Sequence, residues 1–109
     1  MATIVSNNLP VTIIVLNNDA LGMVRQWQTI FFEKRYSNTS LERKTDYVKL
    51  ANAFGIQAEK VDSLDNMEKV IKKSVSGNGP FLVEVKIDPD ERVLPMIPPN
   101  GTIHDIILR

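Results

Sequence analysis

Residues 11–28, VTIIVLNNDALGMVRQWQ, decide the fold of this chain. The run from Val11 to Leu16 is almost wholly apolar and β-branched, which predicts a strand buried on both faces, as in a parallel sheet covered by helices. The Asn-Asn-Asp turn at residues 17–19 ends the strand, and a helical pattern follows at once. In open α/β sheets, ligands bind at such carboxyl ends of strands. We therefore expect a ligand site at this turn.

The composition places the chain in a broad class. It has 109 residues, 13 basic and 13 acidic side chains, and no cysteine. This length predicts a single domain at most. The balanced charge gives no reason to expect nucleic acid or a membrane surface as a partner. The lack of cysteine excludes disulfides and thiolate sites and suits a reducing cytosol or an organelle matrix, so we expect a soluble intracellular protein.

The rest of the chain predicts an α/β fold with a parallel sheet and right-handed crossovers. Met1 to Asn8 reads as the tail of a helix. Apolar spacing predicts a helix over residues 21–32, and residues 33–45 form a polar, basic loop containing Lys34, Arg35, Arg43 and Lys44. Further on we expect a helix capped by Asp46 and ended by Gly55, and then a strand over 56–61 that lies nearer a sheet edge than the first strand. A helix follows Ser63, and its apolar residues share one face: Leu64, Met67, Val70, Ile71 and Val75. The last expected strand covers 81–87 and alternates apolar with charged residues: Val83, Val85 and Ile87 with Glu84 and Lys86.

Proline marks the last part of the chain. Pro89, Pro95, Pro98 and Pro99 follow Asp88 closely, which excludes regular structure and predicts a segment that lies extended over a surface. We therefore divide the chain into residues 1–88, which hold the sheet and its helices, and an extended tail over residues 89–109.

Three features are candidates for chemistry, and each has an ordinary structural explanation. The 17–19 turn could simply cap the next helix, or it could hold magnesium and a diphosphate through amide and carbonyl oxygens at a helix N-terminus. Met23 and Trp27 lie one helical turn apart, which fits core packing as well as a binding wall. His104 beside Asp105 could form a dyad, but no serine or cysteine motif lies near it.

Four segments carry a family resemblance. VLNNDALGMVRQWQ (15–28), FFEKRYS (31–37), DYVKLANAFGI (46–56) and GPFLVEVKIDPDERVLPMIPP (79–99) resemble, in order, the C-terminal part of the catalytic large subunit of acetolactate synthase, or acetohydroxyacid synthase. The combination of Asn-Asn, GMVRQWQ and PMIPP separates this family from pyruvate decarboxylases and pyruvate oxidases, which share its cofactor fold.

This resemblance implies a thiamine diphosphate enzyme, a transferase. It would decarboxylate pyruvate and join the two-carbon unit to a second 2-keto acid in branched-chain amino-acid biosynthesis. Asn18 and the backbone carbonyl of Ala20 match the metal ligands, and Asn18, Ala20, Gly22 and Met23 match the cofactor-binding positions. Met23 and Trp27 match the substrate-binding positions, where a rigid Trp27 wall would favour a slightly larger acceptor. No residue of this chain matches a catalytic one.

The chain also departs from the family pattern. The Gly-Asp-Gly half of the cofactor motif is absent, as are the domains that bind the aminopyrimidine ring, so we expect a fragment that is inactive by itself. By analogy it holds three of six strands, with 81–87 between 11–16 and 56–61. The edge of the 11–16 strand would then be unpaired and one of its apolar faces partly uncovered, which predicts self-association.

The resemblance implies partners and a location as well. The cofactors would be thiamine diphosphate and Mg²⁺, with FAD in other domains of the full-length enzyme, and the substrates would be keto acids. The enzyme would be a homo-oligomer with a regulatory small subunit, located in a bacterial cytoplasm or a plastid stroma. Two alternatives stay open. One is another thiamine diphosphate-dependent carboligase or decarboxylase, and the other is a non-catalytic α/β interaction module.

Overall fold

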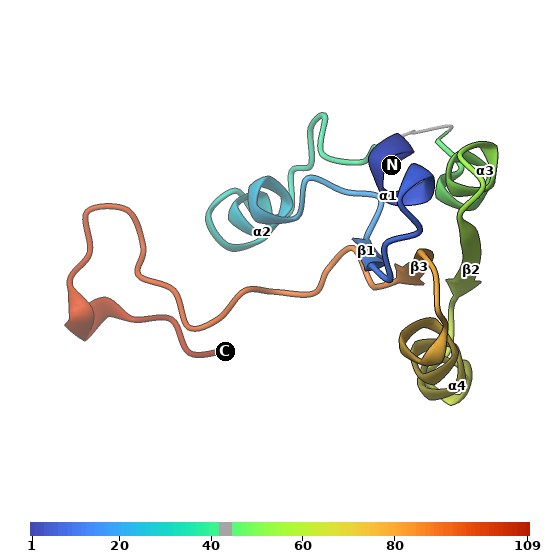
Figure 1. The fold of residues 1–109 in the computed structure, drawn as a ribbon. Coiled ribbons are helices and arrows are strands. Elements are labelled where there is room, and N and C mark those ends of the chain that lie inside the picture. Colours follow the sequence, from blue (N-terminus) through green and yellow to red (C-terminus); the bar gives the residue numbers. More distant parts are fainter. Residues whose placement is uncertain (42–44) are drawn as a thin grey trace. The chain divides into compact units, whose positions relative to one another are not determined.

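The structure is a computed structural model that describes residues 1–41 and 45–109. Its elements are α1 (Ala2–Ser6), β1 (Thr12–Asn17), α2 (Gly22–Phe31), α3 (Tyr47–Ala53), β2 (Gln57–Val61), α4 (Leu64–Ser76), β3 (Phe81–Lys86) and the 3-10 helix η1 (Ile103–Asp105) (Figure 1). They fall into two compact units. The first unit holds Met1–Asp19 and the described part of Glu42–Asp88, and the second holds Ala20–Leu41 and Pro89–Arg109.

The first unit is built on a three-stranded parallel sheet. Its strand order is β1-β3-β2, so β3 lies in the centre (Figure 1). Phe81, at the start of β3, pairs with Thr12 on one side and with Gln57 on the other, and both pairings are parallel. The α/β fold, the parallel direction and the central place of the last strand are therefore confirmed. The strand bounds differ from the predicted ones by a single residue at one or both ends.

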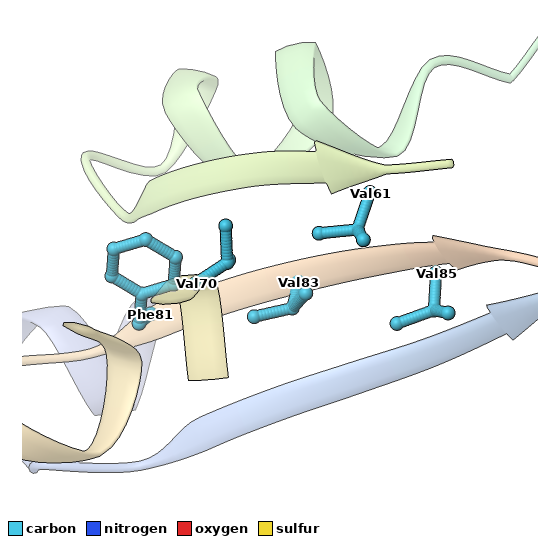
Figure 2. Packing of buried hydrophobic residues seen from close by; sticks show 5 residues of the cluster. All are labelled: Val61, Val70, Phe81, Val83 and Val85. Atoms are coloured by element: carbon cyan, nitrogen blue, oxygen red, sulfur yellow. The ribbon is translucent and has the colours of Figure 1, made fainter. Parts of the chain in front are cut away.

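Helices cover both faces of this sheet. On one face α4 contributes Val70 to a cluster with Val61 of β2 and three residues of β3 (Figure 2). On the other face Leu82 packs with Ala51 of α3 and with Ile56, and Val5 of α1 and Ile13 of β1 lie against them. Because side chains alternate across a strand, the two faces of β3 divide its residues between the two clusters. All five residues from Phe81 to Val85 are buried.

The predicted burial of the first strand on both faces is wrong for this chain. Ile14 is 50% exposed and Leu16 is 66% exposed, whereas Ile13 and Val15 pack against the α1 and α3 side of the sheet. The reason is topological, because β1 is an outer strand of the described sheet and has a neighbour only on its β3 side. The expectation of one partly uncovered apolar face is thus confirmed. The 56–61 strand is not nearer an edge than the first, since both are outer strands.

The sequence predicts where the helices begin and end better than it predicts which of their side chains form capping bonds or are buried. Asp46 is the N-cap of α3 and accepts a hydrogen bond from the Lys49 backbone N–H at 2.9 Å, and Gly55 follows the helix at φ +81°. Ser63 occupies the N-cap of α4, but its side chain makes no capping hydrogen bond. Leu64 and Val75 are 79% and 67% exposed, so the predicted apolar face of α4 is correct only for Met67, Val70 and Ile71. Residues 2–6 form a short helix that ends before β1, as expected of the predicted helix tail.

In the second unit, the Pro-rich tail is anchored to α2. Gln26 is only 4% exposed, accepts a hydrogen bond from the Val93 N–H at 2.8 Å and donates one to the Val93 carbonyl at 3.1 Å. Arg25 forms an ion pair with Asp90 at 2.6 Å. The tail is irregular as predicted, except for η1 and an isolated bridge between Met96 and Ile107. The division into a cofactor-binding part and a tail at residue 88 stays a prediction.

The predicted polar loop is confirmed as irregular chain for residues 33–41, while its Arg43 and Lys44 lie outside the described residues. None of the described helices combines the length and apolar character needed to cross a bilayer.

Candidate functional site

A pocket in the first unit lies between the carboxyl ends of β1 and β3, strand β2 and the start of α3. Its volume is about 570 Å³, and its lining includes Asn17 and Asp19 after β1, Glu84 and Lys86 of β3, and Lys60 of β2. Parallel strands bring their carboxyl ends to the same edge of a sheet, where α/β proteins bind ligands. Asn17 and Asp19, which flank the predicted ligand Asn18, line this pocket, and the assignment of the site residues themselves stays a prediction.

Asn17 shapes the turn that follows β1. Its side-chain oxygen accepts a hydrogen bond from the Asp19 backbone N–H at 3.0 Å, which closes an Asx turn around Asn18. Its side-chain NH₂ donates to a Glu84 carboxylate oxygen at 2.7 Å. Both ends of the Asn17 amide are therefore occupied, and the half-buried Asn18 lies at the crown of the turn.

Asp19 is held by the neighbouring central strand. Its carboxylate forms an ion pair with the Lys86 ammonium, and its backbone has φ +48°, in the left-handed region that non-glycine residues enter uncommonly. The hydrogen bond from the Lys86 ammonium lowers the pKa of the Asp19 carboxyl below its ordinary value. Asp19 therefore stays ionised at neutral pH.

The interpretation of this turn as a helix cap is wrong. The N-cap of α2 is Leu21, whose apolar side chain makes no capping hydrogen bond. The helix begins later than the turn because the Asn17 oxygen is used within the turn itself, and because Ala20 pairs with Ser40 in an isolated antiparallel bridge before the helix starts. The first backbone N–H groups of α2 are thus left without a side-chain cap.

The remaining predicted residues belong to the second unit. Ala20 is 9% exposed and its neighbour Leu21 donates a backbone hydrogen bond to the Thr39 carbonyl at 2.8 Å. Gly22 is the first residue of α2. Met23 and Trp27 follow on one face of the helix, 51% and 39% exposed, so neither fills a core among the described residues. The Trp27 ring packs edge-on against Phe31, with centroids 5.6 Å apart and an interplanar angle of 75°.

The structure thus divides the predicted site residues between its two units. Asn18 lies in the first unit, and Ala20, Gly22, Met23 and Trp27 lie in the second. Asn18 and Ala20 are two residues apart in the chain, a span that cannot exceed about 7 Å. The covalent chain alone therefore keeps these two proposed metal ligands close to each other.

His104 and Asp105 do not form the geometry of a dyad. The Asp105 carboxylate accepts hydrogen bonds from the Thr102 backbone N–H at 2.8 Å and from the Thr102 hydroxyl at 2.9 Å. These bonds lower the pKa of Asp105 and form a capping box for η1. The tail acid therefore has a structural role.

Sequence reasoning missed two residues that organise the site and the tail. Glu84 is 5% exposed in a run of otherwise apolar strand residues, and Gln26 is 4% exposed on α2. The only signal for Glu84 was a carboxylate inside a strand rich in valine. Gln26 gave no signal, because its partners, the Val93 backbone and the Met96 sulfur, lie about 70 residues away in the tail.

Chemically, the described turn offers oxygen ligands. Amide and carbonyl oxygens are hard donors that suit Mg²⁺ better than softer metals. The described residues contain no cluster of three or more His, Cys, Asp or Glu side chains that could hold a metal by themselves. A divalent ion at Asn18 would therefore be completed by other oxygens, such as those of a diphosphate.

Comparison with known proteins agrees with the sheet topology. Residues 1–85 match the family described as thiamine pyrophosphate enzyme, C-terminal TPP binding domain. A solved structure with TM-score 0.69 is a thiamine diphosphate-dependent 4-hydroxybenzoylformate decarboxylase from Rhodococcus jostii RHA1. It is 24% identical and covers 80% of this chain, while this chain covers 16% of it, so it supports the fold alone.

Similar curated proteins are acetolactate synthases. The chain is 38% identical over 107 residues to the acetolactate synthase isozyme 2 large subunit of Escherichia coli K12, 42% identical over 108 residues to the mitochondrial acetolactate synthase of Schizosaccharomyces pombe, and 38% identical over 107 residues to a probable large subunit of Methanocaldococcus jannaschii. These matches cover 98–99% of this chain and 16–20% of the relatives' length. The resemblance found in the motifs is confirmed. The match over residues 1–85, on a parallel sheet of the same fold, shows that this chain belongs to the thiamine pyrophosphate enzyme family, within its C-terminal cofactor-binding domain.

Proposed function

We propose that this chain provides the C-terminal part of the cofactor and substrate site of an acetolactate synthase. The complete enzyme decarboxylates pyruvate and condenses the two-carbon unit with a second 2-keto acid, the entry to branched-chain amino acids. The observation that carries the proposal is the Asn-Asn turn, whose Asn17 lines the pocket of the first unit, in a chain whose curated relatives are acetolactate synthases. Thiamine diphosphate, when bound, supplies the nucleophilic carbon of the reaction.

The turn after β1 would hold the metal. The Asn18 side-chain oxygen and the Ala20 carbonyl are the two ligands that this chain contributes to Mg²⁺. The uncapped N-terminus of α2 carries partial positive charge, which favours the diphosphate group. Gly22 adds no side chain at the first helical position, so an anion can approach the backbone there.

The exposed face of α2 would contact the organic part of the site. Met23 packs beside the cofactor with an adaptable thioether side chain. Trp27 forms a rigid apolar wall for the second keto acid, and its edge-on contact with Phe31 limits how the indole ring can turn. Both side chains are exposed enough in this chain to meet a ligand.

The complete enzyme has further parts in this proposal. They are FAD in another domain, a homo-oligomer of the catalytic subunit, a regulatory small subunit, and a bacterial cytoplasm or plastid stroma as location. Curated relatives include a bacterial large subunit and mitochondrial enzymes.

A chimera tests the proposal. This chain replaces the matched residues of the Escherichia coli isozyme 2 large subunit, and acetolactate formation from pyruvate is measured over a range of Mg²⁺ concentrations. We expect acetolactate as product, and we expect Asn18→Ala to raise the Mg²⁺ requirement by about tenfold or more, since even partners of metal ligands have effects of that size. The exposed Asn52→Ala variant serves as the matched control and should behave like the unmodified chimera.

Two results would contradict the proposal. An unchanged Mg²⁺ requirement in the Asn18→Ala chimera would refute the ligand assignment. A folded chimera that binds thiamine diphosphate but releases only an aldehyde would identify a decarboxylase instead. Circular dichroism and a cofactor-binding titration establish that each chimera is folded before its products are analysed.

A further inference from the structure

Glu84 lies where a carboxylate is costly. It occupies the central strand β3, is 5% exposed, and its neighbours in the strand are apolar. A buried polar group destabilises a protein unless hydrogen bonds replace its contacts with water. Glu84 meets this condition through Asn17, whose side-chain NH₂ donates to it at 2.7 Å. This hydrogen bond offsets part of the cost of burying Glu84 and links the central strand to the turn after β1.

The bond to Glu84 decides how the Asn17 amide is oriented. A carboxylate oxygen only accepts hydrogen bonds, so the Asn17 nitrogen must face it. The Asn17 oxygen is then directed to the Asp19 backbone N–H, 3.0 Å away. If the amide were rotated by half a turn, oxygen would face oxygen and nitrogen would face N–H. Glu84 therefore selects the one orientation that closes the Asx turn.

A second side chain of β3 holds the other end of the same turn. Lys86 lies two residues after Glu84, so both side chains project from one face of the sheet. Lys86 pairs with Asp19, while Glu84 pairs with Asn17. The two residues that flank Asn18 are thus each tied to the central strand, which is itself held by β1 and β2.

We propose that Glu84 is a positioning residue for the metal ligand Asn18. The carboxylate fixes the Asn17 amide, this amide fixes the turn, and the turn holds the backbone of Asn18, whose side-chain oxygen would bind the metal. Lys86 supports the same turn through Asp19. The role of Asn18 as ligand rests on the function proposed above, whereas the control of the turn by Glu84 rests on the hydrogen bonds alone.

The test uses the full 109-residue chain, labelled with ¹⁵N, and compares Glu84→Gln with Glu84→Met. Glutamine keeps an oxygen that can accept the Asn17 hydrogen bond, whereas methionine has a similar volume and no such acceptor. The first measurement is the hydrogen-exchange rate of the Asp19 backbone amide. The second, made with thiamine diphosphate present so that its diphosphate can complete the metal site, is the Mn²⁺ concentration that half-broadens the Asn18 resonances. Glu68→Met removes an exposed carboxylate on α4 and is the matched control.

We expect Glu84→Met to accelerate exchange at Asp19 and to raise the half-broadening Mn²⁺ concentration by about tenfold, the lower end of the effect of a lost ligand partner. Glu84→Gln and Glu68→Met should resemble the unmodified chain in both measurements. Unchanged exchange at Leu82 and Val83 shows that the sheet is intact. Asn17→Leu breaks the same link from an outer strand, and it should repeat the methionine result if Glu84→Met fails to fold.

The outcomes separate the two proposals. Exchange at Asp19 that stays unchanged in a folded Glu84→Met or Asn17→Leu chain overturns the positioning role. Faster exchange at Asp19, combined with Mn²⁺ that never broadens Asn18 in the unmodified chain, supports control of the turn and overturns Asn18 as a metal ligand. Faster exchange together with weaker Mn²⁺ broadening supports both.

Discussion

At the scale of single residues, Trp27 is the side chain that we propose to discriminate between keto-acid substrates. It is 39% exposed, and its edge-on contact with Phe31 restricts the indole ring. A contact worth one methylene group changes selectivity by about 10-fold to 200-fold. We therefore expect Trp27→Leu, in the chimera described above, to reduce the preference for the larger keto acid by about tenfold while pyruvate consumption continues.

The measurement is the ratio of the two condensation products formed from an equal mixture of pyruvate and the next larger 2-keto acid. Phe32→Leu is the control, since Phe32 is also an exposed aromatic residue but lies just beyond the helix. A Trp27→Leu chimera that keeps the original product ratio would remove Trp27 from the substrate site.

Residue chemistry was predictable from the sequence where the partners are local. The Asn-Asn-Asp turn and the Asp46 cap both depend on atoms within three residues, and both occur where the pattern predicts polar backbone contacts. The Asn17 to Glu84 bond joins residues 67 positions apart, so no window of sequence contains it. The cap interpretation of the turn failed for the same reason, because the partner that orients Asn17 lies on another strand.

At the scale of elements, periodicity predicts which segments are helices and strands but not which positions are covered. The apolar residues of α4 have helical spacing, yet Leu64 and Val75 at its two ends are exposed because the three-stranded sheet contacts only its middle. In β3 the alternation of apolar and charged residues suggests that one face is exposed to solvent. In the structure, helices cover both faces and Glu84 is buried. Whether a residue is buried depends on the elements that pack against it, and the sequence of one helix or strand does not reveal them.

The contact between α2 and the tail leads to a prediction at this scale. Gln26 bonds both the N–H and the carbonyl of Val93, so replacing it with methionine leaves two backbone groups without these partners. Leaving such groups unsatisfied costs about 1–3 kcal/mol. We expect Gln26→Met to release this part of the tail, and trypsin should then cut faster after the exposed Arg92.

Limited proteolysis followed by mass spectrometry measures the rate of this cut. Gln57→Met replaces an exposed glutamine on β2 and should leave the rate unchanged. Equal rates of cleavage after Arg92 in the Gln26→Met and unmodified chains would mean that other contacts hold the tail.

At the scale of the whole molecule, the direction of the strands, their order and the grouping into two units differ in what was needed to predict them. Alternation of strands and helices was enough to predict a parallel sheet. The central place of β3 came only from the family resemblance, because three parallel strands can be ordered in several ways. The grouping of Ala20–Leu41 with the tail was not predicted, since it depends on contacts such as that of Gln26 with Val93, which no pattern in the sequence indicates.

The outer position of β1 has a consequence for association. Its far edge has no neighbour in the described sheet, and on one face Ile14 and Leu16 are half or more exposed. An unpaired edge with apolar side chains is a template for pairing with another strand, so we expect the chain to self-associate through β1 at micromolar concentrations.

Leu16→Lys places a charge on this strand and should shift the chain toward the monomer, as lysine does on natural edge strands. Leu64→Lys is the matched control, because Leu64 is even more exposed but lies on α4. Sedimentation velocity over a concentration series measures the effect, and an unmodified chain that stays strictly monomeric would refute association through this edge.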